Sequence, residues 1–162
     1  MMQAKAPLFD AVFDSPVGRL GIVLEGDALR RLSFLDRRTG TRSAGNAAAG
    51  RVQQAILAYL AAPETLPAVP LAVAGTPFQQ RVWAALQAIP AGQVLTYGEL
   101  AAQLHSGARA VGNACRRNPT PLAVPCHRVV PSKGIGGFAG HSSGRLVAVK
   151  RRLLAREGVE IR

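Results

Sequence analysis

The sequence predicts an α+β fold with a small α/β N-terminal lobe and a mainly helical C-terminal lobe. Three observations lead to this prediction. Residues 8–35 contain apolar runs separated by turn signals, which is typical of strands, and residues 76–117 contain helix-capping residues followed by apolar side chains at helical spacing. Prolines at residues 63–70 separate the two regions. We therefore expect two lobes, at residues 1–70 and 71–162.

Three strands are expected in the N-terminal lobe. Residues 8–13, 20–24 and 29–35 are apolar-rich, and the turn signal Glu25-Gly26-Asp27 separates the last two runs. A β-meander is the simplest arrangement of three such strands.

A loop, a helix and a linker are expected after the strands. Residues 37–50 have no apolar period and predict a loop. Apolar side chains at helical spacing predict a helix over residues 51–61: Val52, Ile56, Leu57 and Leu60. Prolines then predict a linker, with the lobe boundary near residues 66–75: Pro63, Pro67 and Pro70.

The C-terminal lobe opens with two predicted helices. Thr76 and Pro77 fit an N-cap followed by proline at the first helical position, and this helix should bury Trp83 and end near residues 90–92. Thr96 fits a capping box with the glutamate three residues later, which predicts a short helix through Leu104.

A turn at residues 105–107 leads into another helix, expected over residues 108–117. Helix, short glycine-containing turn and helix form the helix-turn-helix pattern, although an ordinary helical hairpin in a core would look the same. Small residues flanked by arginines favour a helix that approaches a nucleic-acid groove: Ala108, Arg109, Ala110, Gly112, Asn113, Ala114, Arg116 and Arg117.

The net charge of +11 is concentrated in the C-terminal half. Residues 1–70 hold 8 Lys/Arg and 6 Asp/Glu, whereas residues 71–162 hold 12 Lys/Arg and 3 Asp/Glu. DNA phosphates attract such a surface without regard to base sequence. A solvated basic face, or the arginine bias of a GC-rich genome, would give the same counts.

Composition also bounds the location of the protein. No apolar stretch reaches the roughly 18 residues of a membrane span. The N-terminus lacks the basic and apolar segments of a secretory signal. The two cysteines, Cys115 and Cys126, could in principle pair, but without an export signal we expect them reduced in the cytoplasm. The cysteines and histidines lack metal-ligand spacing, so we expect no metal. Since no apolar stretch is long enough to span a membrane, we also expect no contact with a membrane.

A thiol and an imidazole stand side by side at Cys126 and His127, after an apolar run. A nearby base or cation lowers the pKa of a thiol, and nucleophile, base and orienting group are the parts of covalent catalysis. An inert buried cysteine would give the same pair. A cysteine hydrolase or redox protein unrelated to DNA could also use this Cys-His pair. Such a protein would need an oxyanion hole and would have no need of a groove-binding helix.

The surrounding motifs, in order, are Arg109-Ala110-Val111-Gly112-Asn113-Ala114, Asn118-Pro119-Thr120-Pro121, Pro125-Cys126-His127-Arg128, Gly136-Gly137-Phe138-Ala139-Gly140 and Leu153-Leu154-Ala155-Arg156-Glu157-Gly158. This set resembles the O6-alkylguanine-DNA alkyltransferase family, most closely over residues 75–159. The resemblance implies a ribonuclease H-like N-terminal lobe and a winged-helix-like C-terminal lobe. It also implies a monomer without cofactors that acts on double-stranded DNA containing O6-alkylguanine or O4-alkylthymine. Non-catalytic damage-binding relatives lack the cysteine.

The resemblance also implies roles for individual residues in a single transfer of the alkyl group. Cys126 would be the nucleophile, His127 would take its proton through a water, and Glu157 would hold His127 in the useful tautomer. Asn118 would brace the turn beside the thiol, and Tyr97 would donate a proton or hydrogen bond to guanine.

The remaining implied roles concern DNA and the target base. Arg109 would fill the gap left by a nucleotide extruded from the helix. The other DNA-binding residues would be Ala110, Gly112, Asn113, Cys115 and Arg116, with Cys115 serving only as a small apolar contact. The base pocket would be lined by Tyr97, Val129, Gly137, Phe138 and Ala139. We expect Arg128 to be a structural ion-pair residue.

Overall fold

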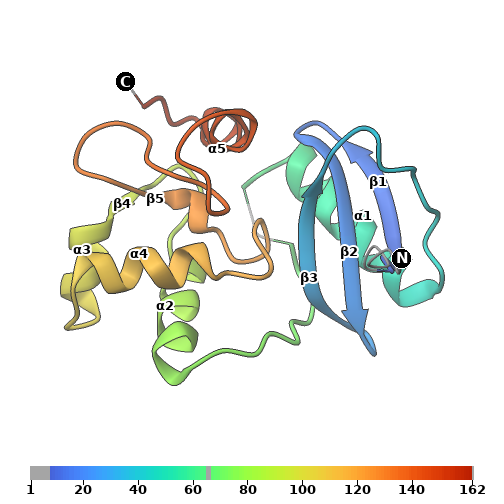
Figure 1. The fold of residues 1–162 in the computed structure, drawn as a ribbon, viewed down its shortest axis with the longest axis horizontal. Coiled ribbons are helices and arrows are strands. Elements are labelled where there is room, and N and C mark those ends of the chain that lie inside the picture. Colours follow the sequence, from blue (N-terminus) through green and yellow to red (C-terminus); the bar gives the residue numbers. More distant parts are fainter. Residues whose placement is uncertain (1–7, 65–66, 162) are drawn as a thin grey trace, which may run out of the picture.

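The computed structural model describes residues 8–64 and 67–161. Residues 1–7, to which the expectation about a secretory signal applies, lie outside these ranges, as does residue 66, where the predicted lobe boundary begins. The described chain mixes helices and strands, as expected for an α+β protein (Figure 1).

The predicted β-meander is confirmed. β1 (Ala11–Ser15), β2 (Gly18–Glu25) and β3 (Ala28–Leu35) form one antiparallel sheet in the order β1-β2-β3. β1 begins three residues later and ends two residues later than predicted, because its pairing with β2 starts at Ala11–Ile22 and closes at Ser15–Gly18. Gly18 has φ of 113°, a conformation that favours glycine in so tight a turn.

The predicted loop at residues 37–50 is wrong over its last four residues, because helix α1 spans Ala47–Ala61. Asn46 caps this helix, since its side-chain oxygen accepts a hydrogen bond from the Ala49 amide at 2.8 Å. The first turn contains only alanine and glycine, which give no apolar period in the sequence. α1 packs on the sheet through buried side chains: Val52, Ile56, Tyr59 and Leu60.

The predicted N-cap at Thr76 and the predicted capping box at Thr96 are both present, and Thr76 also forms a capping box with Gln79 that had not been predicted. These caps open α2 (Pro77–Gln87) at Thr76 and α3 (Tyr97–Gln103) at Thr96. A four-residue turn separates α3 from α4 (Ala108–Arg116), so the predicted pair of helices with a glycine-containing turn is confirmed. Trp83 of α2 is buried as expected, and its indole N–H donates to the Ala114 carbonyl of α4 at 2.9 Å, which fixes α4 on α2.

The rest of the chain frames the candidate site. The 3₁₀ helix η1 (Cys126–Arg128) leads into β5 (Val129–Val130), which pairs in parallel with β4 (Leu95–Thr96). Helix α5 (Arg145–Arg156) had not been predicted as a separate element. It lies beside both the sheet and η1 (Figure 1).

One buried apolar cluster runs through both predicted lobes. It joins Leu20 and Ile56 of the sheet and α1 to Leu86 and Leu153 of the helical part. The linker also adds to the sheet, because the Leu29 amide of β3 donates to the Pro70 carbonyl at 2.8 Å. Among the described residues, no helix is both long and apolar enough to cross a membrane.

Candidate active site

Cys126 stands at the start of η1, immediately after a tight turn. The turn is held by Asn118, whose side-chain amide donates to the Val124 carbonyl at 2.8 Å and whose side-chain oxygen accepts from the Thr120 amide at 3.0 Å. Leu122 has φ of 76°, which is rare for a bulky side chain. The backbone of this turn is therefore strained and is held in this conformation by the surrounding residues. The strained turn fixes the direction in which the thiol leaves the backbone.

Both thiols in the site are protonated at rest. Burial raises the pKa of Cys126, although a hydrogen bond from Asn118 and the nearby Lys150 ammonium oppose that rise. Burial raises the pKa of Cys115 to about 12. A buried thiol therefore needs a base to become a nucleophile, and only Cys126 has an imidazole as its chain neighbour.

His127 is the candidate for that base. It is completely buried, and its Nε2 lies 2.9 Å from Oε1 of Glu157. Burial lowers the pKa of His127, with Glu157 opposing the change, so the imidazole is neutral near physiological pH. An ionised carboxylate can only accept, so Nε2 carries the proton and the lone pair is on Nδ1. Nδ1 is buried and has no hydrogen-bond partner among the described residues.

The Glu157 carboxylate accepts hydrogen bonds from three side chains. The Arg128 guanidinium donates to it from Nε at 2.9 Å and from Nη2 at 2.8 Å, and the Tyr59 hydroxyl donates at 2.7 Å. Burial alone would raise the pKa of Glu157, but hydrogen bonds from His127, Arg128 and Tyr59 bring it down to about 2. The carboxylate therefore stays ionised. Arg128, which is 2% exposed, is the structural ion-pair residue that the sequence predicted.

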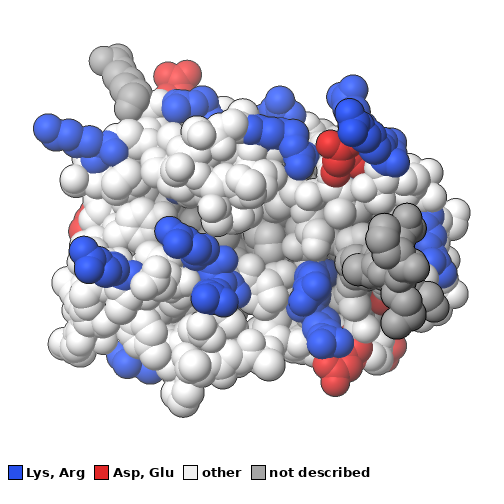
Figure 2. Space-filling view, viewed as in Figure 1, with Lys and Arg blue, Asp and Glu red and all other residues white. Residues whose placement is uncertain are grey.

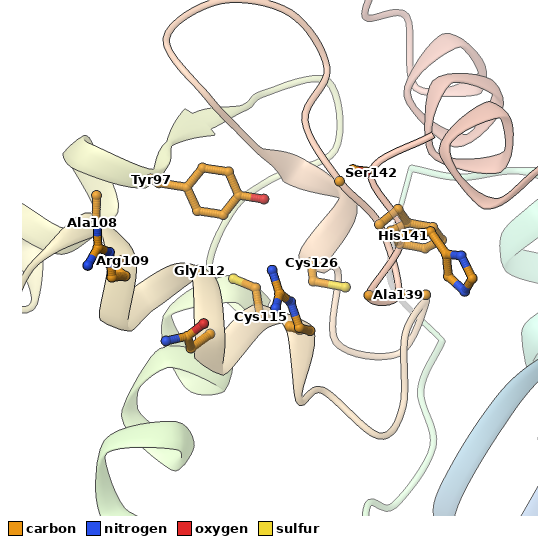
Figure 3. Close-up of a pocket in the computed structure, with 14 residues that line it drawn as sticks. Tyr97, Ala108, Arg109, Gly112, Cys115, Cys126, Ala139, His141 and Ser142 are labelled. Carbon is orange, nitrogen blue, oxygen red and sulfur yellow. The ribbon is translucent and has the colours of Figure 1, made fainter. Parts of the chain in front are cut away.

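A pocket of about 480 Å³ opens in front of the Cys126 sulfur. Tyr97 of α3, Cys115 of α4 and Cys126 of η1 line it, and Figure 3 shows their side chains near one another. Burial raises the pKa of Tyr97 to about 12, so its phenol keeps a proton to donate. Ten of the predicted site residues line this pocket: Tyr97, Arg109, Gly112, Asn113, Cys115, Arg116, Cys126, Gly137, Phe138 and Ala139.

Five predicted site residues lie outside the pocket wall. His127, Glu157 and Asn118 stand behind Cys126 and act on it or on one another, as described above. Ala110 is exposed on α4 and lines a neighbouring hollow against α2. Val129 is fully buried, and its carbonyl accepts from Lys150 Nζ at 2.8 Å, so its contact with a base stays a prediction.

Sequence reasoning missed two polar side chains of this site. Lys150 is fully buried and also donates to the Gly137 carbonyl at 3.0 Å, which ties the pocket loop to β5. Tyr59 reaches Glu157 from 98 positions earlier in the chain. Neither residue belongs to a local pattern. Ala108, His141 and Ser142 also line the pocket (Figure 3).

The pocket opens onto a basic surface. Arg109, Arg116 and Arg117 of α4 are exposed, and Glu99 is the only acidic residue between residues 75 and 150. Figure 2 shows Lys and Arg side chains spread across the face that carries α4, with few acidic side chains among them. Gly112 leaves the surface of α4 without a side chain beside Tyr97, although a Cβ there would fit in ordinary contact with the ring at 4.0 Å. This face suits a polyanion.

No cluster of three or more potential metal ligands occurs within residues 8–64 and 67–161. The side chains of the site offer a thiol, a neutral imidazole with a free lone pair, and a phenol that retains its proton.

Comparison with known proteins agrees with this chemistry. A family model described as the DNA-binding domain of 6-O-methylguanine DNA methyltransferase matches residues 77–159. The methylated-DNA–protein-cysteine methyltransferase of Mycobacterium leprae is 40% identical over 145 residues, which cover 85% of this chain and 87% of that protein.

Two solved structures extend the similarity to the whole fold. The Mycobacterium tuberculosis O6-methylguanine methyltransferase superimposes with a TM-score of 0.77 at 35% identity, covering 93% of each chain. The Mycobacterium tuberculosis OGT in complex with DNA gives a TM-score of 0.70 at 35% identity, covering 91% of each chain. This chain thus belongs to the 6-O-methylguanine DNA methyltransferase family.

Proposed function

We propose that this protein repairs DNA by moving the alkyl group of O6-alkylguanine onto Cys126. The observation that carries this proposal is the position of the Cys126 thiol at a base-sized pocket, with the His127–Glu157 pair directly behind it. The thioether product is stable to ordinary reductants, so each molecule repairs one lesion. O4-alkylthymine offers the same kind of electrophilic carbon and is a second expected substrate.

The transfer needs one proton removed and one supplied. His127 Nδ1 takes the Cys126 proton through a bridging water, and Glu157 stabilises the resulting imidazolium through Nε2. The thiolate attacks the alkyl carbon, and the carbon–O6 bond breaks with its electron pair staying on guanine. Tyr97, whose phenol keeps its proton, supplies a proton or hydrogen bond to the departing base.

The target carbon is inaccessible inside a duplex, so the nucleotide must be rotated out of the base stack, at a cost of a few kcal/mol. The basic face around α4 would bind the phosphates, and Arg109, exposed at the pocket rim, would occupy the space left in the helix. Gly112, Asn113, Cys115 and Arg116 share that rim, and Ala110 extends the same helix surface. The fold likeness to a relative in complex with DNA supports this interface.

Finer structural assignments belong to the same proposal. Residues 1–70 would form a ribonuclease H-like lobe, which the three-stranded meander and α1 support. Residues 71–162 would form a winged-helix-like lobe, which α2, α3 and α4 support. We expect a cytoplasmic monomer.

A stoichiometry experiment tests the proposed function. The protein is mixed with duplex DNA carrying O6-[³H-methyl]guanine, in excess, and protein-bound label is counted over time. The proposal expects the label to stop at one methyl group per protein. Continued turnover would contradict it, and tight binding without transfer would favour a damage-binding protein, which the presence of Cys126 argues against.

A further inference from the structure

Tyr59 connects the N-terminal sheet region to the proton relay. It projects from α1, is 3% exposed, and its hydroxyl lies 2.7 Å from Glu157 Oε1 and 3.3 Å from His127 Nε2. No other described residue outside the C-terminal half donates a side-chain hydrogen bond to Glu157 or His127.

The direction of these hydrogen bonds follows from the charges. Glu157 is ionised and can only accept, so the hydroxyl of Tyr59 donates to it. Burial raises the pKa of Tyr59 well above its usual value, so the phenol is never the acid in this network. The hydroxyl oxygen is then left as an acceptor that faces the Nε2–H of His127. The imidazole proton therefore lies between two acceptors, Glu157 and Tyr59, and Nδ1 is left as the base.

The position of Tyr59 is fixed from both sides. Its neighbour on α1, Leu60, accepts a hydrogen bond through its carbonyl from Arg156, the residue before Glu157. Arg152, one turn earlier on α5, donates to the Pro16 carbonyl of the β1–β2 turn at 3.2 Å. The end of α5 is thus bound to the N-terminal region where Tyr59 meets Glu157, which holds the backbone of the two segments together at this point.

We infer that Tyr59 is a positioning residue of the transfer reaction, through which the N-terminal region sets the orientation and basicity of His127. This inference rests on the proposed proton relay. Its physical basis is competition for one carboxylate: each donor to Glu157 Oε1 takes a share of the negative charge that otherwise acts on His127.

Removing the hydroxyl should leave more of that charge to His127. The hydroxyl oxygen also accepts from Nε2, which favours the imidazolium, but this contact is 3.3 Å long against 2.7 Å for the contact with Glu157, so the gain in carboxylate charge outweighs its loss. In Tyr59→Phe, the midpoint of His127 titration should therefore move to higher pH by about half a unit to one unit, which is a three- to tenfold change in proton affinity. The other charged groups that act on His127 are Arg128 on η1 and Lys150 on α5, and neither is altered by this substitution. The rate constant for transfer should fall as well, because the imidazole loses one of its two restraints.

Two measurements test the inference. The chain has 3 histidines, so imidazole NMR signals in histidine-labelled protein can be assigned by single substitutions and titrated without substrate. Single-turnover transfer from free O6-benzylguanine gives the rate constant, while its amplitude counts folded protein, so partial unfolding does not affect the rate. Ile56→Val is the matched control, since Ile56 is buried on α1 but makes no hydrogen bond to the relay.

The inference expects a raised His127 midpoint and a slower transfer in Tyr59→Phe, with both values unchanged in Ile56→Val. A His127 midpoint equal to the wild-type value would overturn it, whatever the rate. A wild-type protein that accepts neither the benzyl group nor the methyl group of O6-methylguanine DNA would instead contradict the proposed function, and the titration would still decide the role of Tyr59.

Discussion

Glu157→Gln separates the chemical role of Glu157 from its structural one. The substitution keeps the shape of the side chain and removes its charge. The carboxylate accepts from His127, Arg128 and Tyr59, and its side chain is completely buried. In the amide, the –NH₂ group must face one of these donors, so one hydrogen bond is lost and the buried Arg128 guanidinium keeps no counter-charge.

The stability cost can be worked out in two ways. The pKa of Glu157 falls from 4.5 to about 2 in the folded protein, which corresponds to about 3 kcal/mol of folding free energy at neutral pH. Removing one partner of a buried ion pair costs about 3–5 kcal/mol. A domain that is stable by about 5–15 kcal/mol should survive this loss. Urea unfolding at pH 7 measures it.

The chemical cost follows from the tautomer of His127. Without an ionised acceptor at Nε2, the proton can move to Nδ1, where it blocks the base. The single-turnover rate constant should fall by about 10²–10⁴-fold, the usual contribution of a positioned general base. DNA affinity should stay near the wild-type value, because Glu157 is buried away from the α4 surface.

Glu160→Gln is the matched control, since it removes an exposed acid three residues later. It should leave both stability and rate unchanged. A wild-type rate constant in Glu157→Gln, together with the loss of stability, would refute the reasoning and make Glu157 only the structural partner of Arg128.

Three further predictions follow from the same geometry. Arg109→Ala should strongly slow transfer from alkylated duplex DNA and slow transfer from free O6-benzylguanine much less, because the free base needs no extrusion; equal losses on both substrates would mean that Arg109 supports the pocket instead. Tyr97→Phe should slow transfer by about tenfold, the value of one buried hydrogen bond, with unchanged DNA affinity in a gel-shift titration; weaker DNA binding at an unchanged rate would assign Tyr97 to the interface. Wild-type stability should fall as the pH drops below 6.5, because the unfolded chain protonates His127 more readily than the folded protein does, and should fall again between pH 4.5 and about 2 as Glu157 protonates. Urea midpoints across this range should lack the second decrease in Glu157→Gln.

Local signals predicted much of the fold. Thr76 followed by Pro77 identified the start of α2, and Thr96 with Glu99 three positions later identified the start of α3, because capping depends on residues that are close in the sequence. The start of α1 could not be predicted in the same way, since alanine and glycine in its first turn have no apolar period and Asn46 caps it without a glutamate or glutamine at the third position. α5 mixes seven apolar residues with four arginines and one lysine, and which of its side chains are buried depends on both the sheet and η1.

The candidate site likewise contains residues that local motifs predicted and residues that they did not. The predicted pocket residues belong to contiguous motifs, and ten of them meet in one cavity. Tyr59 and Lys150 reach the site through tertiary packing, and a buried tyrosine or lysine in the sequence has no pattern that distinguishes it from an exposed one. The site's support therefore becomes visible only when distant segments are brought together.

The identity of the modified atom tests the central claim most directly. The protein is incubated with duplex DNA containing O6-methylguanine, and the intact mass and the peptide map are then measured. The account predicts one added methyl group, located on Cys126, and no added mass in Cys126→Ala. A methyl group on Cys115, whose thiol faces the same pocket but has no base beside it, would contradict the account, as would repair of the DNA without any change in the mass of the protein.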